Sequence, residues 1–170
     1  MKKALIGTAL ASGILLSAQT TLADTGYVGI DYQMYTYSVS GQDDAEPESI
    51  ALKLGGSLNQ YFKVEARLGR SVKDDNTQSD AVKVSNTVGF YLKGGMDVMN
   101  MVFPYFITGY SKYDIKHYGD TYTAAESAVS WGVGADFHYQ KVQVGVEWMR
   151  VADKSQYDLE AVSVSAAYRF

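Results

Sequence analysis

Apolar and polar residues alternate with period two along most of the chain from residue 26 onward. This period is typical of β-strands, whose successive side chains point to opposite faces of a sheet. Between residues 127 and 139, for example, Val129, Trp131 and Val133 share one face, while Ser130 and Gly132 share the other. The alternation predicts eight strands, at about 26–38, 49–59, 61–72, 84–95, 102–115, 127–139, 141–151 and 158–170.

The strand at 102–115 is the least regular of the eight. Its apolar, outward face is expected to hold Phe103, Tyr105, Ile107 and Tyr113. Its polar, inward face is then expected to hold Phe106, Thr108, Tyr110, Lys112 and Asp114. The assignment matters because a slip of one residue exchanges the two faces of a strand.

The connections between the strands alternate in length. Long, polar links fall at about 39–48, 73–83, 116–126 and 152–157, and short turns fall near Asn59-Gln60, Asp97–Met101 and Gln140. An even number of strands, with long links at one end and short turns at the other, is typical of bacterial outer-membrane barrels. Strands of this length, tilted by about 40°, are long enough to cross the hydrocarbon layer. The sequence therefore predicts an all-β fold, an eight-stranded antiparallel up-and-down transmembrane β-barrel.

The polar face of the strands argues against a soluble alternative. A secreted lipocalin is also an eight-stranded barrel, but its interior must hold an apolar ligand. Here the second face carries glycine, serine and charged residues on nearly every strand. Such a face suits the interior of a membrane barrel better than an apolar cup.

The first 23 residues have the pattern of a bacterial secretory signal. Lys2 and Lys3 precede an apolar run over residues 4–18, and Thr21-Leu22-Ala23 forms a small-residue exit. The apolar run is shorter than the about 20 residues of a membrane helix. We therefore expect residues 1–23 to be a cleaved signal peptide and residues 24–170 to form the outer-membrane barrel domain.

Composition removes several kinds of chemistry from consideration. The chain has 170 residues, no cysteine, two histidines (His117 and His138) and a formal net charge of −4. Disulfides, thiolate metal sites and a cysteine nucleophile are excluded, and no basic footprint indicates nucleic acid. The acidic segments 43–48 and 74–75 lack the spacing of a calcium-binding loop. No metal and no cofactor are expected.

Catalysis by a small membrane barrel, such as a lipid A deacylase, would need a serine, a histidine and an acid. The candidates are Ser130, His138 and Glu147. A nucleophile must lie within hydrogen-bond reach of its base, but Ser130 and His138 are separated on one strand by more than about 20 Å. We therefore expect no catalytic residues and no enzymatic activity, and lipid A modification is the least favoured function.

The polar face is expected to line the lumen with charges of both signs. This lumen charge network consists of Asp31, Lys53, Lys63, Glu65, Arg67, Lys93, Lys112, Asp114, Asp136, Glu147 and Arg169. Its six bases and five acids nearly cancel, and the interior of an eight-stranded barrel is only wide enough to be filled by side chains. A plug of ion pairs is therefore favoured, and a narrow porin-like ion channel stays open as the alternative.

Aromatic residues on the apolar face are expected to form girdles at the two membrane boundaries. The girdle residues are Phe62, Phe103, Tyr105, Trp131, Phe137, Tyr139 and Trp148. The last strand ends on an aromatic residue, preceded by apolar residues at every second position. Val164, Ala166, Tyr168 and Phe170 look like the terminal signal that the barrel-assembly machinery recognises.

The sequence resembles the OmpX/Ail type of small outer-membrane barrel, within the broader OmpA-like and opacity-protein class. The resemblance rests on residues 130–137 (SWGVGADF), on the strand over 142–148 and on the terminal residues 166–170 (AAYRF). It implies a monomeric structural or surface-interaction barrel in the outer membrane of a Gram-negative bacterium. Adhesion, host interaction, serum resistance and envelope integrity are the implied roles.

The partners implied by the resemblance are outer-membrane lipid or lipopolysaccharide, the barrel-assembly machinery and an extracellular protein or host-surface ligand bound by the loops. The long links lack the alternating runs that would extend the sheet far above the membrane. An adhesive edge strand is therefore not expected from the sequence.

Overall fold

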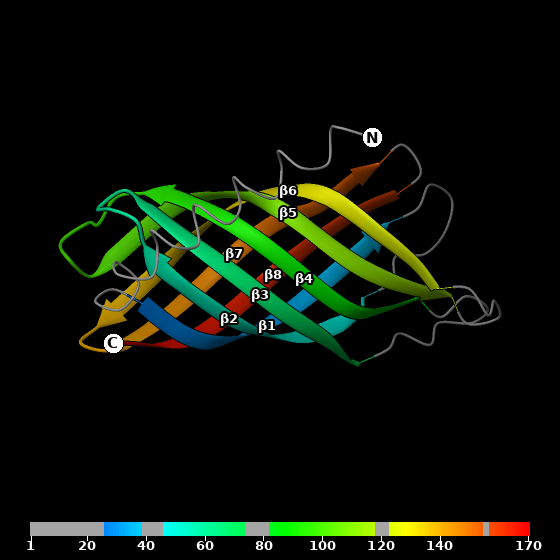
Figure 1. Ribbon diagram of the computed structural model, residues 1–170, viewed down its shortest axis with the longest axis horizontal. Helices are drawn as coiled ribbons and strands as arrows, with labels where there is room; N and C mark the ends of the chain where they lie inside the picture. The colour runs from blue at the N-terminus through cyan, green and yellow to red at the C-terminus, as the bar shows by residue number, and fades with distance from the viewer. Residues whose placement is uncertain (1–25, 39–45, 74–81, 118–122, 155–156) are drawn as a thin grey trace, which may run out of the picture.

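A computed structural model describes residues 26–38, 46–73, 82–117, 123–154 and 157–170, which form a single barrel (Figure 1). The expected signal peptide, residues 1–23, lies outside the described residues. The strands are β1 (Gly26–Ser38), β2 (Glu48–Ser57), β3 (Phe62–Lys73), β4 (Val82–Gly95), β5 (Val102–His117), β6 (Thr123–Tyr139), β7 (Val142–Lys154) and β8 (Tyr157–Arg169).

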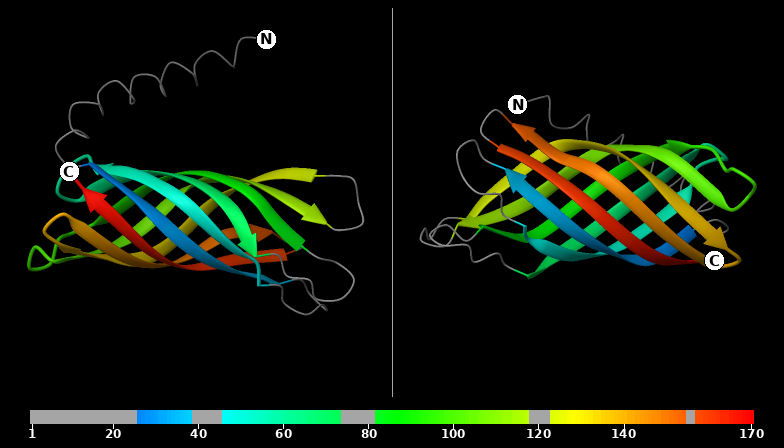
Figure 2. Two further views of the ribbon diagram at one scale, coloured as in Figure 1. Left: turned by 90° about the horizontal axis from the view of Figure 1, so that it is seen from below. Right: turned by 180° about the vertical axis from the view of Figure 1, so that it is seen from behind.

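Each strand pairs antiparallel with its neighbours in the sequence, and β8 pairs with β1 to close the barrel. The closing seam runs from the pair of Tyr27 and Arg169 to the pair of Ser38 and Asp158. The strands are tilted against the barrel axis, as the two views in Figure 2 show. The predicted eight-stranded antiparallel up-and-down barrel is therefore confirmed.

One end of the barrel carries the short turns β2–β3, β4–β5 and β6–β7, together with the start of β1 and the end of β8 (Figure 2). In the β2–β3 turn, the Asn59 side-chain oxygen accepts hydrogen bonds from the N–H groups of Tyr61 and Phe62, at 2.8 and 2.9 Å. Gln140, in the β6–β7 turn, has a positive φ of 54°. Short turns face the periplasm in outer-membrane barrels, so we call this the periplasmic end and the other the outer end.

The outer wall of the barrel is a continuous apolar surface. On β7, for example, Val142, Val144 and Val146 are 54%, 43% and 46% exposed. Among the described strand residues, outward-facing charges begin only toward the outer end, at Glu48, Arg70, Lys112, Arg150, Asp158 and Glu160. A wide apolar band bounded by charged residues is what contact with a hydrocarbon layer requires.

Strand β5 faces the opposite way from the sequence-based assignment, which was wrong for this strand. Phe103, Tyr105 and Ile107 are 0%, 5% and 0% exposed and point into the lumen. Phe106 and Tyr110 instead lie on the outer wall, 49% and 53% exposed.

The reason for the error is that β5 carries large apolar and aromatic residues on both faces, so alternation alone does not choose between them. The choice is made by neighbouring strands. Lys63 on β3 places its ammonium 3.6 Å from the centroid of the Phe103 ring, and Lys93 on β4 lies 4.2 Å from that of Tyr105. These buried ammonium groups stabilise aromatic rings on the inward face.

Candidate functional site

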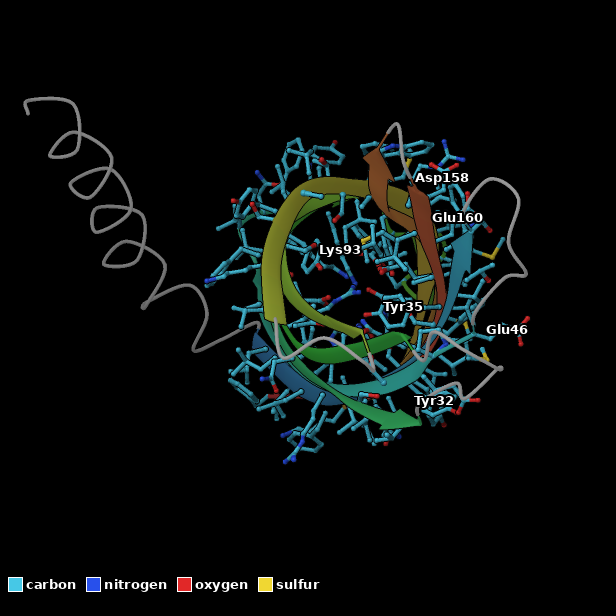
Figure 3. All side chains as sticks on the ribbon, turned by 90° about the vertical axis from the view of Figure 1, so that its right-hand side faces the viewer. Tyr32, Tyr35, Glu46, Lys93, Asp158 and Glu160 are labelled. Carbon is cyan, nitrogen blue, oxygen red and sulfur yellow. The ribbon has the colours of Figure 1, made fainter. Side chains whose placement is uncertain are left out.

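The inward face of the barrel brings buried charges of both signs together in the lumen. The view from the outer end in Figure 3 shows Lys93 and Tyr35 inside the wall and Tyr32 outside it. The buried members are the bases Lys53, Lys63, Arg67 and Lys93 and the acids Asp31, Glu65, Asp136 and Glu147. Four positive and four negative charges balance, so no net charge is left in the lumen from these residues.

Arg67, on β3, is the centre of the network. Its guanidinium donates to both carboxylate oxygens of Glu147 on β7, at 2.7 and 2.9 Å. Its Nε donates to Glu65 Oε1 at 2.6 Å, and Asp31 Oδ2 lies 3.4 Å from its Nη1. The bidentate contact connects opposite walls of the barrel and fixes the orientation of both side chains.

Glu65 is the second residue of the network with several charged partners. It accepts a hydrogen bond from the Tyr27 hydroxyl, and its Oε2 lies 3.1 Å from Lys93 Nζ and 3.5 Å from Lys53 Nζ. Lys93 Nζ is also 3.6 Å from Asp136 Oδ2. The charges therefore form one connected network, in which removing one member deprives several others of a partner.

Aromatic rings from β4 and β5 cover this network. The Arg67 guanidinium lies 4.7 Å from the centroid of the Tyr91 ring, and Lys93 packs on Tyr105 as described above. The Tyr105 hydroxyl donates to Glu147 Oε2 at 2.8 Å. Sequence analysis missed Tyr105 as a lumen residue because it assigned β5 to the wrong face.

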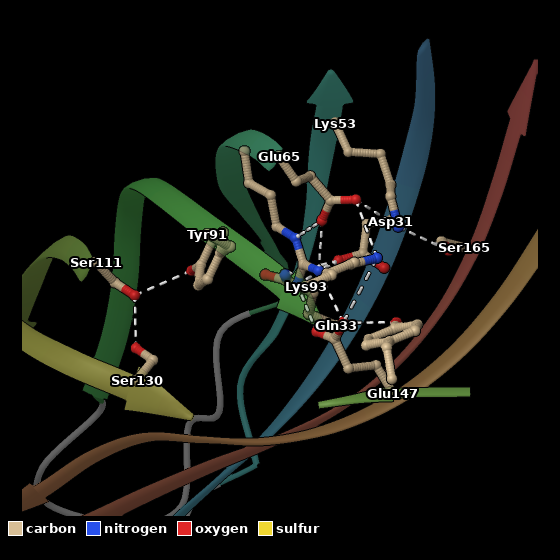
Figure 4. Close-up of polar contacts among 12 residues, drawn as sticks. Asp31, Gln33, Lys53, Glu65, Tyr91, Lys93, Ser111, Ser130, Glu147 and Ser165 are labelled. Atoms are coloured by element: carbon tan, nitrogen blue, oxygen red, sulfur yellow. Dashed lines mark hydrogen bonds and ion pairs between the residues drawn. The ribbon is translucent and has the colours of Figure 1, made fainter. Parts of the chain in front are cut away.

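The lumen becomes less polar toward the outer end. A chain of hydroxyl contacts runs from Tyr91 to Ser111 at 2.9 Å and on to Ser130 at 2.7 Å (Figure 4). Beyond it, the buried side chains are mostly apolar and belong to one cluster, which includes Tyr35, Val151, Ala152, Leu159 and Ala161. The lumen is thus filled by side chains at its centre and at its outer end.

Three members of the predicted lumen charge network are not among these buried residues. Lys112 is exposed on the outer wall, because β5 is turned over, so its assignment to the lumen was wrong. Arg169 continues the inward row of β8 but is only half-buried at the periplasmic end. The side chain of Asp114 lies outside the described residues.

The predicted girdles change for the same reason. Phe103 and Tyr105 are lumen residues, whereas Phe62, Trp131, Phe137, Tyr139 and Trp148 lie on the outer wall. Trp131 and Trp148 contact each other edge to face, with ring centroids 5.5 Å apart. Whether the wall residues act as membrane girdles, and whether residues 164–170 act in assembly, stays a prediction.

Ser130, His138 and Glu147, the three side chains considered for catalysis, each bind a different group and not one another. Ser130 Oγ donates to the carbonyl oxygen of Val151 at 3.0 Å, and His138 Nε2 lies 2.7 Å from Asp97 Oδ1 in the β4–β5 turn. Glu147 is bound to Arg67. They form no serine–histidine–acid arrangement.

Gln33 is a lumen residue that sequence analysis did not single out. Its Nε2 donates to Asp31 Oδ2 at 2.8 Å, and its Oε1 accepts from the Tyr35 hydroxyl at 2.6 Å. Alternation along β1 places these side chains on the inward face, but only the structure gives their partners.

In the described part of the chain, no group of histidine and acidic side chains is arranged to hold a metal ion. No helix among those residues is long and apolar enough to cross a membrane.

A family model described as the outer membrane protein beta-barrel domain matches residues 6–170. The chain belongs to this family. It is therefore an outer-membrane β-barrel, in agreement with the wide apolar band of its outer wall. No curated protein sequence gives a significant match.

Solved structures with the same fold come from several bacteria. The surface protein NspA of Neisseria matches with a TM-score of 0.68 and 15% identity, over 85% of this chain and 97% of that chain. Ail, the attachment invasion locus protein of Yersinia pestis, crystallised with the heparin analogue sucrose octasulfate, matches with a TM-score of 0.66 and 14% identity, over 85% and 97%. The N-terminal barrel of Pseudomonas aeruginosa OprF gives 0.55 and 8%, over 84% and 97%.

Proposed function

We propose that this protein is a sealed outer-membrane scaffold that presents a protein-binding strand edge on the cell surface. The observation that supports this proposal is the unequal length of two neighbouring strand pairings. Strand β6 pairs with β5 as far as Thr123 with Lys116, but its pairing with β7 ends at Trp131 with Arg150. Within the described residues, the segment 123–129 of β6 therefore has a paired strand neighbour on one side only.

The polar groups of this free edge belong to alternate residues. The N–H of His138 donates to Met101 O, and the carbonyl of Ser130 accepts from Thr108 Oγ1, so even-numbered residues of β6 face β5. Because N–H and C=O of one strand residue point to the same side, residues 123, 125, 127 and 129 direct theirs toward β7. Among the described residues, no pairing with β7 occupies these groups, so an added strand could bond to them.

The sequence of the edge supports the same role. Natural proteins protect exposed edges with charged side chains, especially lysine, and with proline or bulges, whereas residues 123–129 read TAAESAV, with one charged residue, Glu126, and neither lysine nor proline. The strand begins at Thr123, four residues before the expected start at 127. An extended segment of a host or envelope protein can add to such an edge through main-chain hydrogen bonds. NspA is a surface protein and Ail is an attachment protein, and the similarity of this chain to both supports a surface role.

Outer-leaflet lipid is the second partner that we propose. Arg150 and Glu160 form an ion pair at 2.9 Å on the outer wall, and the Arg150 guanidinium lies 5.8 Å from the Trp131 ring centroid. Charged and aromatic groups at this level suit lipopolysaccharide head groups. The barrel-assembly machinery stays a proposed partner through residues 164–170, and we propose no catalytic role.

Ala125→Pro tests the free edge, because proline removes an N–H that points away from β5. Cells that display this variant are expected to lose adhesion to cultured epithelial cells, at an unchanged surface level of the protein. Ala125→Ser keeps the N–H and is expected to adhere like the wild type. Full adhesion by the proline variant, measured against a strain without the protein, would contradict the edge proposal.

The sealed lumen predicts that purified protein gives no steady ion-selective conductance in planar lipid bilayers. The reason is that the described side chains of the central charge network and of the apolar outer cluster occupy the lumen. A narrow channel instead predicts single-channel steps whose ion preference changes when a lining charge is removed. Reproducible steps with altered selectivity in Glu147→Gln would favour the channel.

A further inference from the structure

Three polar side chains at the periplasmic end of the lumen have atoms that meet no hydrogen-bond partner among the described residues. They are Asp136 and His138 on β6 and Gln143 on β7. The unpartnered atoms are both carboxylate oxygens of Asp136, Nδ1 of His138, and Oε1 and Nε2 of Gln143. Asp136 and Gln143 are 0% and 1% exposed, and His138 is 8% exposed. Buried polar atoms in native proteins are rarely left unpaired, because desolvation without a partner is costly.

The strand register brings these groups together. His138 and Gln143 are directly opposite each other, and Asp136 is opposite Gly145, one inward position further along. Gly145 leaves room for these groups, because a Cβ at this position would lie 2.7 Å from both Asp136 Oδ1 and Ser165 Oγ and would displace them. The five unpartnered atoms therefore belong to one small region, between β6, β7 and β8.

The chemistry of the atoms specifies what can bind. When the Nε2–H of His138 donates to Asp97 Oδ1 (2.7 Å), its Nδ1 is an acceptor. Four of the five atoms then accept hydrogen bonds, and Gln143 Nε2 donates. Lys93 Nζ, which also has no hydrogen-bond partner among the described residues, lies 3.6 Å from Asp136 Oδ2 and is a second donor beside the region. The ligand must therefore both donate and accept hydrogen bonds, and it must be neutral, because the eight buried charges already balance.

We propose that this region, the Asp136–His138–Gln143 site, binds internal water molecules that are part of the folded barrel. Water is the small neutral molecule that donates two hydrogen bonds and accepts others. A buried water makes about two to four hydrogen bonds, so the five atoms require about two molecules. The lumen is hydrated at its periplasmic end, therefore, and dry at its apolar outer end. Asp97, with a side chain 38% exposed, covers the site on the periplasmic side.

Two buried glutamines allow the proposal to be tested within one sample of wild-type protein in lipid nanodiscs. Gln143 has no partner for its side-chain amide among the described residues, whereas Gln33, 4% exposed, donates to Asp31. Water-to-amide magnetisation transfer by NMR is expected at the Gln143 side-chain N–H protons and not at those of Gln33. Absence of transfer at Gln143 would show a dry site, and equal transfer at both would show a generally wet lumen. Either result would overturn the proposal.

A second measurement concerns the cover of the site. Asp97→Ala removes the contact with His138 and is expected to raise the rate at which the Gln143 side-chain protons exchange with solvent deuterium. Asp97→Asn keeps an oxygen that can accept from His138 and is expected to leave that rate close to the wild-type value. An unchanged rate in Asp97→Ala would contradict water entry on the Asp97 side.

Discussion

Glu147→Ala is expected to lower the free energy of unfolding by about 3–5 kcal/mol, the usual cost of leaving a buried charge without its partner. The carboxylate accepts two hydrogen bonds from Arg67 and one from Tyr105, and it is 6% exposed. Its loss leaves the Arg67 guanidinium with one charge partner fewer in the middle of the lumen. The cost falls on the folded state only, because the unfolded chain solvates these groups with water.

Glu160→Ala is the matched control for this prediction. Glu160 also pairs with an arginine, Arg150, but the two side chains are 36% and 33% exposed. An ion pair of this kind contributes about 0–1 kcal/mol. Urea unfolding of the refolded barrel in lipid vesicles, followed by its heat-dependent mobility on a denaturing gel, measures both values. Similar small losses for the two variants would show that water screens the lumen charges, as a channel requires.

The order and facing of most strands can be predicted from the sequence because one face meets lipid and the other meets a polar lumen. On β7 this contrast is complete, since Val142, Val144 and Val146 alternate with Gln143 and Gly145. Each residue type then has only one favourable side. A physical difference between the two environments, and not an intrinsic strand preference, is what the alternation reports.

Strand β5 could not be assigned in this way, because its inward face is also apolar. Phe103 and Tyr105 pack against the buried ammonium groups of Lys63 and Lys93. An aromatic ring is stabilised by such a contact in the lumen, so lipid is not the only favourable environment for these two rings. The information that decides the facing lies on β3 and β4, in Lys63 and Lys93. Cation–π contacts between strands leave no trace in the alternation of a single strand.

The lumen site was predictable in composition but not in connectivity. Alternation placed Arg67 and Glu147 inside, yet they are 80 residues apart, and several acids compete for the same guanidinium. Which acid lies beside Arg67 depends on how neighbouring strands are shifted against each other in the closed barrel, and alternation along the sequence does not give this shift. The edge that we propose on β6 was not expected from the sequence for a related reason, since it depends on where the pairing with β7 ends.

Val144→Arg is expected to destabilise the membrane-inserted barrel by about 2–4 kcal/mol, the usual cost of arginine near the midplane of a lipid-facing barrel wall. Val144 is 43% exposed on the outer wall and lies between Phe137 on β6 and Ala166 on β8, well below the outward charges of the outer end. No acidic side chain among the described residues of the wall is close enough in register to pair with the new charge. The guanidinium must therefore lose its water or distort the bilayer.

Val72→Arg is the control, because it makes the same chemical change on the same wall at a different depth. Val72 is 56% exposed and lies beyond Arg70 toward the outer end of β3, so its arginine should cost about 0–1 kcal/mol. Phe106→Arg, on the outward face of β5, should behave like Val144→Arg and so tests the facing of that strand. Equilibrium unfolding in lipid vesicles distinguishes these outcomes. Equal costs at Val144 and Val72 would mean that the apolar band is not where lipid contacts the barrel. A small cost at Phe106 alone would mean that Phe106 does not face lipid, as the sequence-based assignment of β5 had it.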